Sequence, residues 1–211
     1  MSNNNTTILI TGCAGFIGAA LTKKFLSLNY KVIGIDNIND YYDVSLKKDR
    51  LRQIEDTCLK LKIKEKWKFL KCDLSDNNKL EEIFISYKPK TVINLAAQAG
   101  VRNSIEKPLD YINSNIYGFF NILEMCRQFN IRHLIYASSS SVYGANKYLP
   151  FSEKHSVNHP ISLYAATKKS NELMAHSYCH LYKFAATGLR FFTIYGPWGR
   201  PDMAPMIFAK A

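Results

Sequence analysis

The chain has 211 residues, of which 47% are hydrophobic and 21% are charged. This composition is that of one sizeable globular domain and excludes a disordered or fibrous chain. A transmembrane helix needs about 20 successive apolar residues, and we find no such run. The N-terminal stretch MSNNNTT lacks the basic and apolar regions of a signal peptide. We therefore expect a cytoplasmic protein.

The formal net charge of +11 suits an anionic partner, such as nucleic acid, an acidic membrane or a phosphorylated small molecule. Many of the lysines lie in KLKIKEKWKFLK, residues 60–71. We interpret them as solvated charges that protect a strand rather than as a polyanion site, and expect neither nucleic acid nor membrane as a partner. The five cysteines show no C-x-x-C spacing, which favours a reducing compartment. His176 and His180 lack a third ligand, so we predict no metal site.

Strands and helices alternate along the sequence. In chain order, we predict a strand at 8–12, a helix at 19–29, a strand at 30–36, a helix at about 45–60, a strand at 66–74, a helix at 76–88, a strand at 91–97, a helix at 111–129, a strand at 131–139, a helix at 162–182 and a strand at 185–196. The strands are near-continuous apolar runs, which is typical of a parallel sheet covered by helices on both faces. We therefore predict a Rossmann-like, doubly wound α/β fold that binds its ligand beyond the carboxyl ends of the strands.

A glycine-rich turn, TGCAGFIG, joins the first strand to the first helix. In such a turn Gly12 permits the tight bend, Gly15 lets a pyrophosphate approach the backbone, and Gly18 lets the helix pack closely. The helix N-terminus then faces the phosphates. The spacing predicts a dinucleotide site, although it is G-x-x-G-x-x-G rather than the commoner G-x-G-x-x-G.

Two acids end the next two predicted strands. At the end of the second strand, Asp36 is placed to accept hydrogen bonds from an adenosine ribose and to repel a 2′-phosphate, which favours NAD over NADP. The alternative for Asp36 is a loop cap. Asp73 ends the third strand and is placed to reach the adenine, and for it a capping role stays equally open.

Tyr164 and Lys168 stand at i and i+4 on the predicted helix 162–182 and share one face. A lysine ammonium one turn away, together with a positive nicotinamide, would favour the tyrosine phenolate as a base. The serine row 138–141 in YASSSSVYG ends the fifth strand, at the same sheet edge. We therefore expect these hydroxyls to line an active site rather than to form a linker.

Taken together, these stretches resemble the extended short-chain dehydrogenase/reductase family and, more narrowly, the UDP-glucuronate 4-epimerases. The matching stretches are TGCAGFIG, DNINDYYDVSLK, NLAAQAGVR, YASSSSVYGAN, HPISLYAATKKSNELMAHSY and LRFFTIYGPWGRPDMAPM. The resemblance implies an NAD-dependent enzyme that oxidises carbon 4 of a UDP-sugar to a 4-keto sugar and reduces it again on the other face. It implies that Tyr164 accepts the proton of the 4-hydroxyl, that Lys168 holds the nicotinamide ribose, and that Ser139 hydrogen-bonds the sugar oxygen.

The resemblance also implies two sets of binding residues. For NAD they are Gly12, Gly15, Phe16, Ile17, Gly18, Asp36, Asn37, Asp73, Leu74, Leu95, Ala96, Ala97, Ser114, Tyr164, Lys168 and Phe192. For the substrate they are Ser139, Ser140, Ser141, Thr193 and Arg200. Among these, Arg200 is our choice for binding the glucuronate carboxylate, because guanidinium pairs with carboxylate bidentately. The alternative is a loop arginine that pairs with Asp202.

Two departures from the resemblance limit the function. Sugar 4,6-dehydratases carry an Asp-Glu pair where this chain has Ser140 and Ser141, which argues against dehydration. Members of the family continue into a smaller substrate-binding region, which this chain largely lacks. We therefore divide it into a disordered polar tail at 1–7, an NAD-binding domain at 8–195 and the start of a substrate region at 196–211, and expect exposed apolar surface where that region would pack.

Three hypotheses stay open at this stage. The first is a UDP-glucuronate 4-epimerase or its NAD-binding part. The second is a 4-epimerase of another UDP-sugar, such as UDP-glucose or UDP-N-acetylglucosamine. The third is a non-catalytic protein that binds NAD or a polyanion. The resemblance also implies a homodimer through the helices at 111–129 and 162–182.

Overall fold

The computed structural model describes residues 6–209. Six strands form one parallel sheet in the order β3-β2-β1-β4-β5-β6. They are β1 (Thr7–Thr11), β2 (Lys31–Asp36), β3 (Trp67–Lys71), β4 (Thr91–Asn94), β5 (His133–Ser139) and β6 (Ala185–Phe191). The predicted doubly wound parallel sheet is confirmed. The strand order reverses between β1 and β4, which is the point where sheets of this kind bind ligands.

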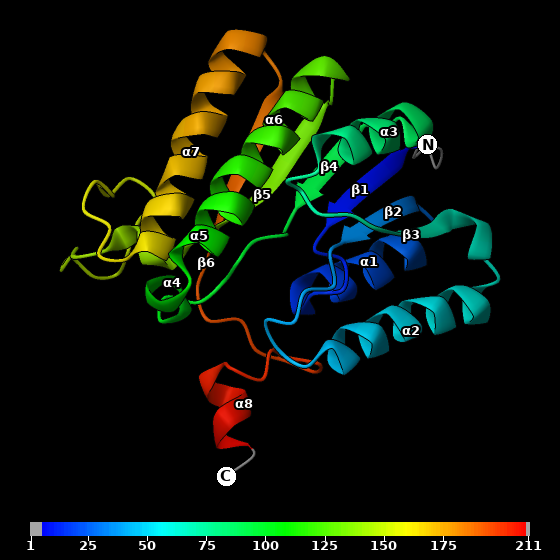
Figure 1. Cartoon of the computed structure of the whole chain (residues 1–211), viewed down its shortest axis with the longest axis horizontal. Helices are drawn as coiled ribbons and strands as arrows, with labels where there is room; N and C mark the ends of the chain where they lie inside the picture. The colour runs from blue at the N-terminus through cyan, green and yellow to red at the C-terminus, as the bar shows by residue number, and fades with distance from the viewer. Residues whose placement is uncertain (1–5, 210–211) are drawn as a thin grey trace.

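Helices pack against both faces of the sheet (Figure 1). The long ones are α1 (Phe16–Ser27), α2 (Val44–Leu61), α3 (Asn77–Tyr87), α6 (Gly118–Gln128) and α7 (Leu163–Tyr182). Short helical pieces are η1 (Lys64–Lys66), α4 (Asn103–Glu106), α5 (Pro108–Tyr111), η2 (Ile112–Tyr117), η3 (Ser140–Tyr143) and α8 (Ala204–Phe208). None of the helices in the described part of the chain is long and apolar enough to cross a membrane.

Alternate residues of the strands feed two separate cores. On one face, Ile10 of β1 packs with Leu26 of α1 and Ile54 of α2. On the other face, Leu9 packs with residues of α3 and α6, including Phe84. Burying a leucine or isoleucine side chain contributes about 1.5–3 kcal/mol, so both faces of the strands have to be apolar. This is why the strands read as continuous apolar runs.

Several strands are shorter than we predicted, because each strand ends where its pairing with the neighbouring strand ends. The last pairs are Thr11 with Asn94 and Ser139 with Phe191. Beyond these pairs, residues 95–97 and 192–196 have no ladder partner, and they leave the sheet as loops at its carboxyl edge. The shortened strands therefore supply the loops that form the ligand site.

The predicted helix 111–129 is not a single regular α-helix. It begins as α5, passes through the π-helical turn η2 and continues as α6. Within η2 the buried Asn115 accepts a hydrogen bond from the backbone N–H of Gln98 at 2.7 Å and donates to Thr167 Oγ1 at 3.1 Å. Gly118 then brings α6 against Leu74, because an added Cβ would lie 2.8 Å from the Leu74 Cβ. These long-range contacts override the simple helical periodicity.

The first strand begins one residue earlier than we predicted. Thr7 is buried and pairs with Lys31 as the first residue of β1, so it is not part of a disordered tail. Residues 1–5, for which we predicted disorder, lie outside the described residues.

The lysine run lies on the end of α2, on η1 and on the edge strand β3, with Lys64, Lys68 and Lys71 exposed. An edge strand is where a protective row of lysines is expected.

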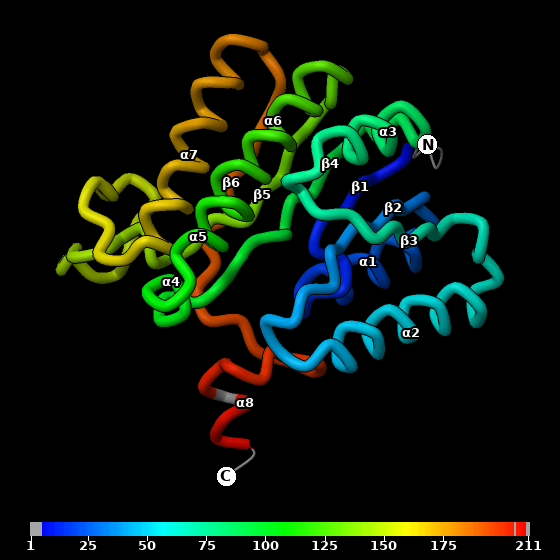
Figure 2. Tube along the Cα trace, in the orientation of Figure 1, coloured from blue at the N-terminus to red at the C-terminus, as the bar shows by residue number. Residues whose placement is uncertain are grey.

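The opposite edge of the sheet is less well covered. Along β6 the alternate residues Ala185, Thr187 and Leu189 are exposed. After β6, the chain crosses the carboxyl edge of the sheet to the start of α2 and then turns into α8, as Figures 1 and 2 show. Arg50 of α2 anchors this crossing segment, since its Nη2 donates to the carbonyl of Trp198 at 2.7 Å.

Candidate active site

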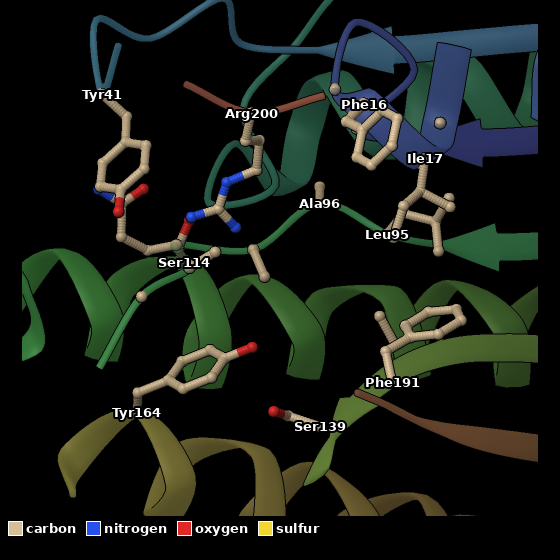
Figure 3. Close-up of a pocket in the computed structure, with 18 of the residues that line it drawn as sticks. Phe16, Ile17, Tyr41, Leu95, Ala96, Ser114, Ser139, Tyr164, Phe191 and Arg200 are labelled. Carbon is tan, nitrogen blue, oxygen red and sulfur yellow. The ribbon is translucent and has the colours of Figure 1, made fainter. Parts of the chain in front are cut away.

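A cavity of about 430 Å³ opens beyond the carboxyl ends of the strands. Every residue that the sequence predicts for catalysis, cofactor binding or substrate binding lines this one cavity. Figure 3 shows Tyr164 and Ser139 on one side, Arg200 opposite them, and Phe16 and Ile17 at the far end. The lining also includes residues that we did not predict, among them Asn39, Tyr41, Tyr42, Lys47 and Gln98. Asn39, Tyr41, Tyr42 and Lys47 lie in DNINDYYDVSLK, residues 36–47, which is one of the stretches that carry the family resemblance. That stretch could have pointed to these residues, but we assigned them no role.

The glycine-rich turn has the geometry that a dinucleotide needs. Gly12 has a φ of +69°, and a Cβ there would lie 2.8 Å from the backbone N of Ala96. A Cβ on Gly18 would lie 2.1 Å from the carbonyl oxygen of Gly12, so only glycine lets α1 pack onto the turn. No side chain caps the N-terminus of α1, and its first turn has no acidic residue. Uncapped N–H groups at a helix start attract an anionic phosphate.

Asp36 serves both the cavity and its own loop. Its Oδ2 accepts from the Ala14 N–H at 3.1 Å, and its Oδ1 accepts from the Ile38 N–H at 2.9 Å. The buried Lys47 ammonium lies 3.9 Å from the same Oδ1. A carboxylate has about four acceptor positions, so these contacts leave room for ribose hydroxyls. The loop-cap alternative and a cofactor role are therefore compatible.

Asp73 has a similar double setting. Its Oδ2 accepts from Asn37 Nδ2 at 2.7 Å, and its Oδ1 accepts from the N–H and hydroxyl of Ser75 at 2.9 and 2.7 Å. Burial acts to raise the Asp73 pKa, but the hydrogen bonds from Asn37 and Ser75 outweigh it and lower the pKa. Asp73 thus shapes its turn while it lines the cavity beside Asn37.

Helix α7 presents Tyr164 and Lys168 to the cavity. The helix begins after Ser162, whose hydroxyl accepts from the Ala165 N–H at 3.1 Å. The Lys168 ammonium is buried and donates to the carbonyl of Ala137 at 2.9 Å. It lies 6.0 Å from the centre of the Tyr164 ring. Burial lowers the pKa of Lys168 to about 8.

The pKa of Tyr164 moves against the direction that we expected from Lys168. Burial raises it, while the hydrogen bond with Ser139 and the charge of Arg200 oppose the rise. The Lys168 ammonium is itself buried and donates its hydrogen bond to the carbonyl of Ala137. In the protein without ligands, Tyr164 is therefore a protonated phenol at neutral pH.

The serine row divides between two environments. Ser139 ends β5 and caps η3, which Ser140 and Ser141 begin, and all three line the cavity. The Ser141 hydroxyl donates to Ser139 Oγ at 2.9 Å. Ser138 instead donates to Glu172 at 2.7 Å. Glu172 in turn accepts two 2.9 Å hydrogen bonds from Arg190 of β6. Ser138 therefore anchors the strand end against α7, and its neighbours form the hydroxyl-rich wall.

On the opposite wall, Arg200 has the partner that the alternative interpretation named. Its Nε donates to Asp202 Oδ1 at 3.0 Å, and its Nη2 donates to Asp202 Oδ2. Arg200 nevertheless lines the cavity, on the side that faces Tyr164 (Figure 3). Within residues 6–209, no group of three or more histidine, cysteine or acidic residues is placed to hold a metal ion.

The comparison with known families agrees with this geometry. The sequence profile of the GDP-mannose 4,6-dehydratase family matches residues 9–209, nearly the whole chain. The chain belongs to the GDP-mannose 4,6-dehydratase family. This family is part of the extended short-chain dehydrogenases/reductases, as the sequence motifs predicted.

Curated relatives within the family share much of the sequence. Protein CapI of Staphylococcus aureus is 61% identical over 97% of this chain and 59% of its own length. UDP-glucuronate 4-epimerase 4 of Arabidopsis thaliana is 47% identical over 99% of this chain and 46% of its own. The chain therefore spans about three-fifths or less of the length of these relatives.

Solved structures of family members share the fold. The UDP-glucuronic acid 4-epimerase of Bacillus cereus, in complex with UDP-glucuronic acid and NAD, aligns with a TM-score of 0.80 and 34% identity, over 95% of this chain and 61% of its own. The UDP-glucose 4-epimerase of Thermotoga maritima, with UDP-glucose, aligns with a TM-score of 0.81 and 30% identity, over 93% and 59%. Fold likeness alone does not separate the two sugars.

Proposed function

We propose that this chain binds NAD and takes part in the 4-epimerisation of UDP-glucuronate to UDP-galacturonate. One observation carries the proposal. Tyr164 and Ser139 lie on one side of the cavity with Arg200 opposite them (Figure 3), and the glycine-rich turn and Asp36 line the same cavity. The relatives and the B. cereus structure that bear the UDP-glucuronate 4-epimerase name support the choice of substrate.

The residues present fit NAD. The uncapped start of α1 and the close packing at Gly12 and Gly18 leave backbone N–H groups for a pyrophosphate. Asp36 has spare acceptor positions for the adenosine ribose, and its charge disfavours a 2′-phosphate. Leu95, Ala96 and Ala97 add apolar lining to the same cavity. Bound there, NAD would supply the hydride acceptor and donor for carbon 4 of the sugar.

The protein's own groups then manage the proton and the position of the sugar. The Tyr164 oxygen is placed to accept the proton of the 4-hydroxyl and to return it after the sugar turns. The Tyr164 hydroxyl acts as a base only when its pKa falls, and the positively charged nicotinamide ring of a bound NAD would favour that fall. The Ser139 hydroxyl is placed to hold the sugar oxygen, because it lines the same cavity as Tyr164.

The charges around the cavity favour glucuronate and epimerisation. Arg200 brings a cation to the substrate end, where a glucuronate has a carboxylate and a glucose has none. Among the described lining residues, the carboxylates are Asp36, which ends β2, and Asp73, which follows β3. Ser140 and Ser141 carry no carboxylate beside Ser139, so the acid and base for a dehydration are not at hand. Family membership therefore does not bring dehydratase activity with it.

The compartment and the assembly belong to this proposal too. We place the activity in the cytoplasm, because all five cysteines are free thiols. We infer a homodimer through α6 and α7, because Phe120, Leu173 and Leu181 expose apolar surface on these two helices. Light scattering on the purified chain tests the dimer, and a monomer at micromolar concentration would overturn it.

The substrate is tested by NAD-dependent turnover of UDP-glucuronate, UDP-glucose and UDP-N-acetylglucosamine, followed by proton NMR. We expect conversion of UDP-glucuronate only, and an Arg200→Leu variant that loses this conversion while it still binds NAD. Turnover of the neutral sugars at a similar rate, or an Arg200→Leu variant with unchanged glucuronate turnover, would contradict the assignment.

A further inference from the structure

Arg200 is in contact with Asp202 and with Tyr41, and sequence reasoning gave Tyr41 no role. Asp202 accepts from its Nε at 3.0 Å and also from its Nη2. The Tyr41 hydroxyl donates to Asp202 Oδ2 at 3.3 Å, and the Arg200 guanidinium lies 5.6 Å from the centre of the Tyr41 ring. The three side chains thus form one cluster between the loop after β2 and the segment before α8.

The contact with Asp202 leaves part of the guanidinium unused. A guanidinium has five N–H donors in a planar fork, and Asp202 takes the Nε side of it. The outer edge, made by Nη1 and the second Nη2 proton, is free of Asp202. A second carboxylate is able to bind that edge bidentately without breaking the first pair. Asp202 is therefore compatible with a substrate anion on the same arginine.

The backbone that carries Arg200 is also fixed. Arg50 is 1% exposed, and it donates to the carbonyls of Trp198 at 2.7 Å and Gly199 at 3.3 Å. It donates as well to the carbonyl of Ala14, in the glycine-rich turn, at 3.2 Å. Trp198 has a φ of +65°, a conformation that a bulky residue adopts only when its surroundings impose it. The segment is thus pinned in place before Arg200 enters the cavity.

The charges of the cluster suit a fixed arginine at neutral pH. Burial acts to raise the Asp202 pKa, but the hydrogen bond and charge of Arg200 outweigh it and lower the pKa. Asp202 is therefore ionised. Burial, followed by the charge of Asp202, raises the pKa of Tyr41 to about 12, so Tyr41 stays a hydrogen-bond donor.

We propose that Asp202 and Tyr41 are positioning residues that hold the Arg200 guanidinium with its outer edge toward the substrate anion. This rests on the proposed function, in which Arg200 binds the glucuronate carboxylate. The competing outcome is that Asp202 occupies Arg200 in place of the substrate and so weakens substrate binding. The two differ in the sign of the effect when the Asp202 charge is removed.

The first measurement needs no substrate. The exchange rate of the Arg200 Nε–H with water is followed by ¹⁵N NMR, with the signal assigned by its loss in Arg200→Lys. Because the pair is charge-assisted, Asp202→Asn should speed exchange about tenfold or more. Tyr41→Phe should speed the exchange about two- to threefold. Asp40→Asn makes the same charge change as Asp202→Asn, but next to Tyr41, and should leave the exchange rate unchanged. An Asp202→Asn rate within about twofold of the parent would overturn the proposal.

The second measurement is calorimetric affinity of the NAD-loaded chain for UDP-glucuronate and UDP-glucose. Asp202→Asn should weaken UDP-glucuronate about tenfold and change UDP-glucose by less than about twofold. Unchanged or tighter UDP-glucuronate binding would show competition and overturn the proposal. If the parent binds both sugars equally, or neither, the glucuronate assignment loses its support, and the Nε–H exchange rate alone decides whether Asp202 and Tyr41 hold Arg200.

Discussion

The ammonium of Lys168, on α7, donates a 2.9 Å hydrogen bond to the carbonyl oxygen of Ala137, on β5. This contact ties the helix that carries Tyr164 to the strand that ends in Ser139. It also places a cation in a buried position, where its only described hydrogen bond is to a neutral carbonyl. The burial of the Lys168 charge therefore comes at a cost in stability.

The first prediction concerns this cost. Burial lowers the Lys168 pKa from 10.5 to about 8. Between these pH values the unfolded chain binds more protons than the folded chain, so stability should rise with pH from about 8 to about 10.5. At pH 7, burying the charge costs roughly 3 kcal/mol. We expect Lys168→Met to be at least as stable as the parent at pH 7 in urea unfolding, and to lose NAD-dependent turnover.

The pH dependence is the control for Lys168→Met. The stability advantage of the variant should shrink as the pH is raised from about 8 to about 10.5, because the buried lysine of the folded parent is then neutral and no longer buries a charge. A difference in free energy of unfolding that does not change with pH would contradict a depressed Lys168 pKa.

The second prediction concerns Tyr164. Tyr164→Phe removes the oxygen that we propose as the acceptor of the sugar proton and leaves the ring in place. We expect kcat for epimerisation to fall by about 10³-fold or more, with NAD affinity and thermal unfolding little changed. Tyr182→Phe, at the exposed end of the same helix, should retain full activity. Residual activity within about tenfold of the parent would mean that another group transfers the proton.

The third prediction concerns the choice of cofactor. Asp36→Asn keeps one acceptor for the Ala14 and Ile38 N–H groups but removes the charge that opposes a 2′-phosphate. We expect NAD to bind about tenfold more weakly and the preference for NAD over NADP to fall, as measured by titration of intrinsic fluorescence. Asp56→Asn, on the exposed side of α2, makes the same charge change away from the site. If both variants shift NAD affinity equally, the effect comes from net charge alone.

The fourth prediction concerns the glycine-rich turn. A Cβ at position 18 would lie 2.1 Å from the carbonyl oxygen of Gly12, which is backbone and cannot yield without moving the turn. We expect Gly18→Ala to lower the free energy of unfolding by about 1–3 kcal/mol and to abolish measurable NAD binding. Unchanged NAD affinity in a folded Gly18→Ala variant would show that the turn does not set the phosphate site.

Much of the fold and the lining of the site could be predicted from sequence, because each depends on local pattern. Apolar runs located the six strands, and the rule that parallel sheets bind ligands at their carboxyl edge located the loops. Gly12 with its positive φ and Asp36 at a strand end are recognisable from spacing alone. The remaining site residues were implied by the family resemblance, and they line the same cavity.

What sequence could not provide depends on contacts between distant segments. The π-helical turn at 112–117 arises from hydrogen bonds between Asn115 and residues of other loops and of α7. The direction of the Lys168 ammonium depends on Ala137 across the helix–sheet interface. The hydrogen bond between Tyr41 and Asp202 joins residues that lie far apart in the chain, and no local periodicity marks it.

The most direct test of the account is a proton NMR time course of UDP-glucuronate with NAD. It is run on this chain and on a chimera in which residues 1–209 are followed by the remaining C-terminal part of the S. aureus relative, because the chain spans 59% of that protein. We predict that galacto-configured UDP-galacturonate accumulates with the chimera, and that its Tyr164→Phe form yields none. A folded chimera that binds NAD but leaves UDP-glucuronate unchanged would contradict the central claim.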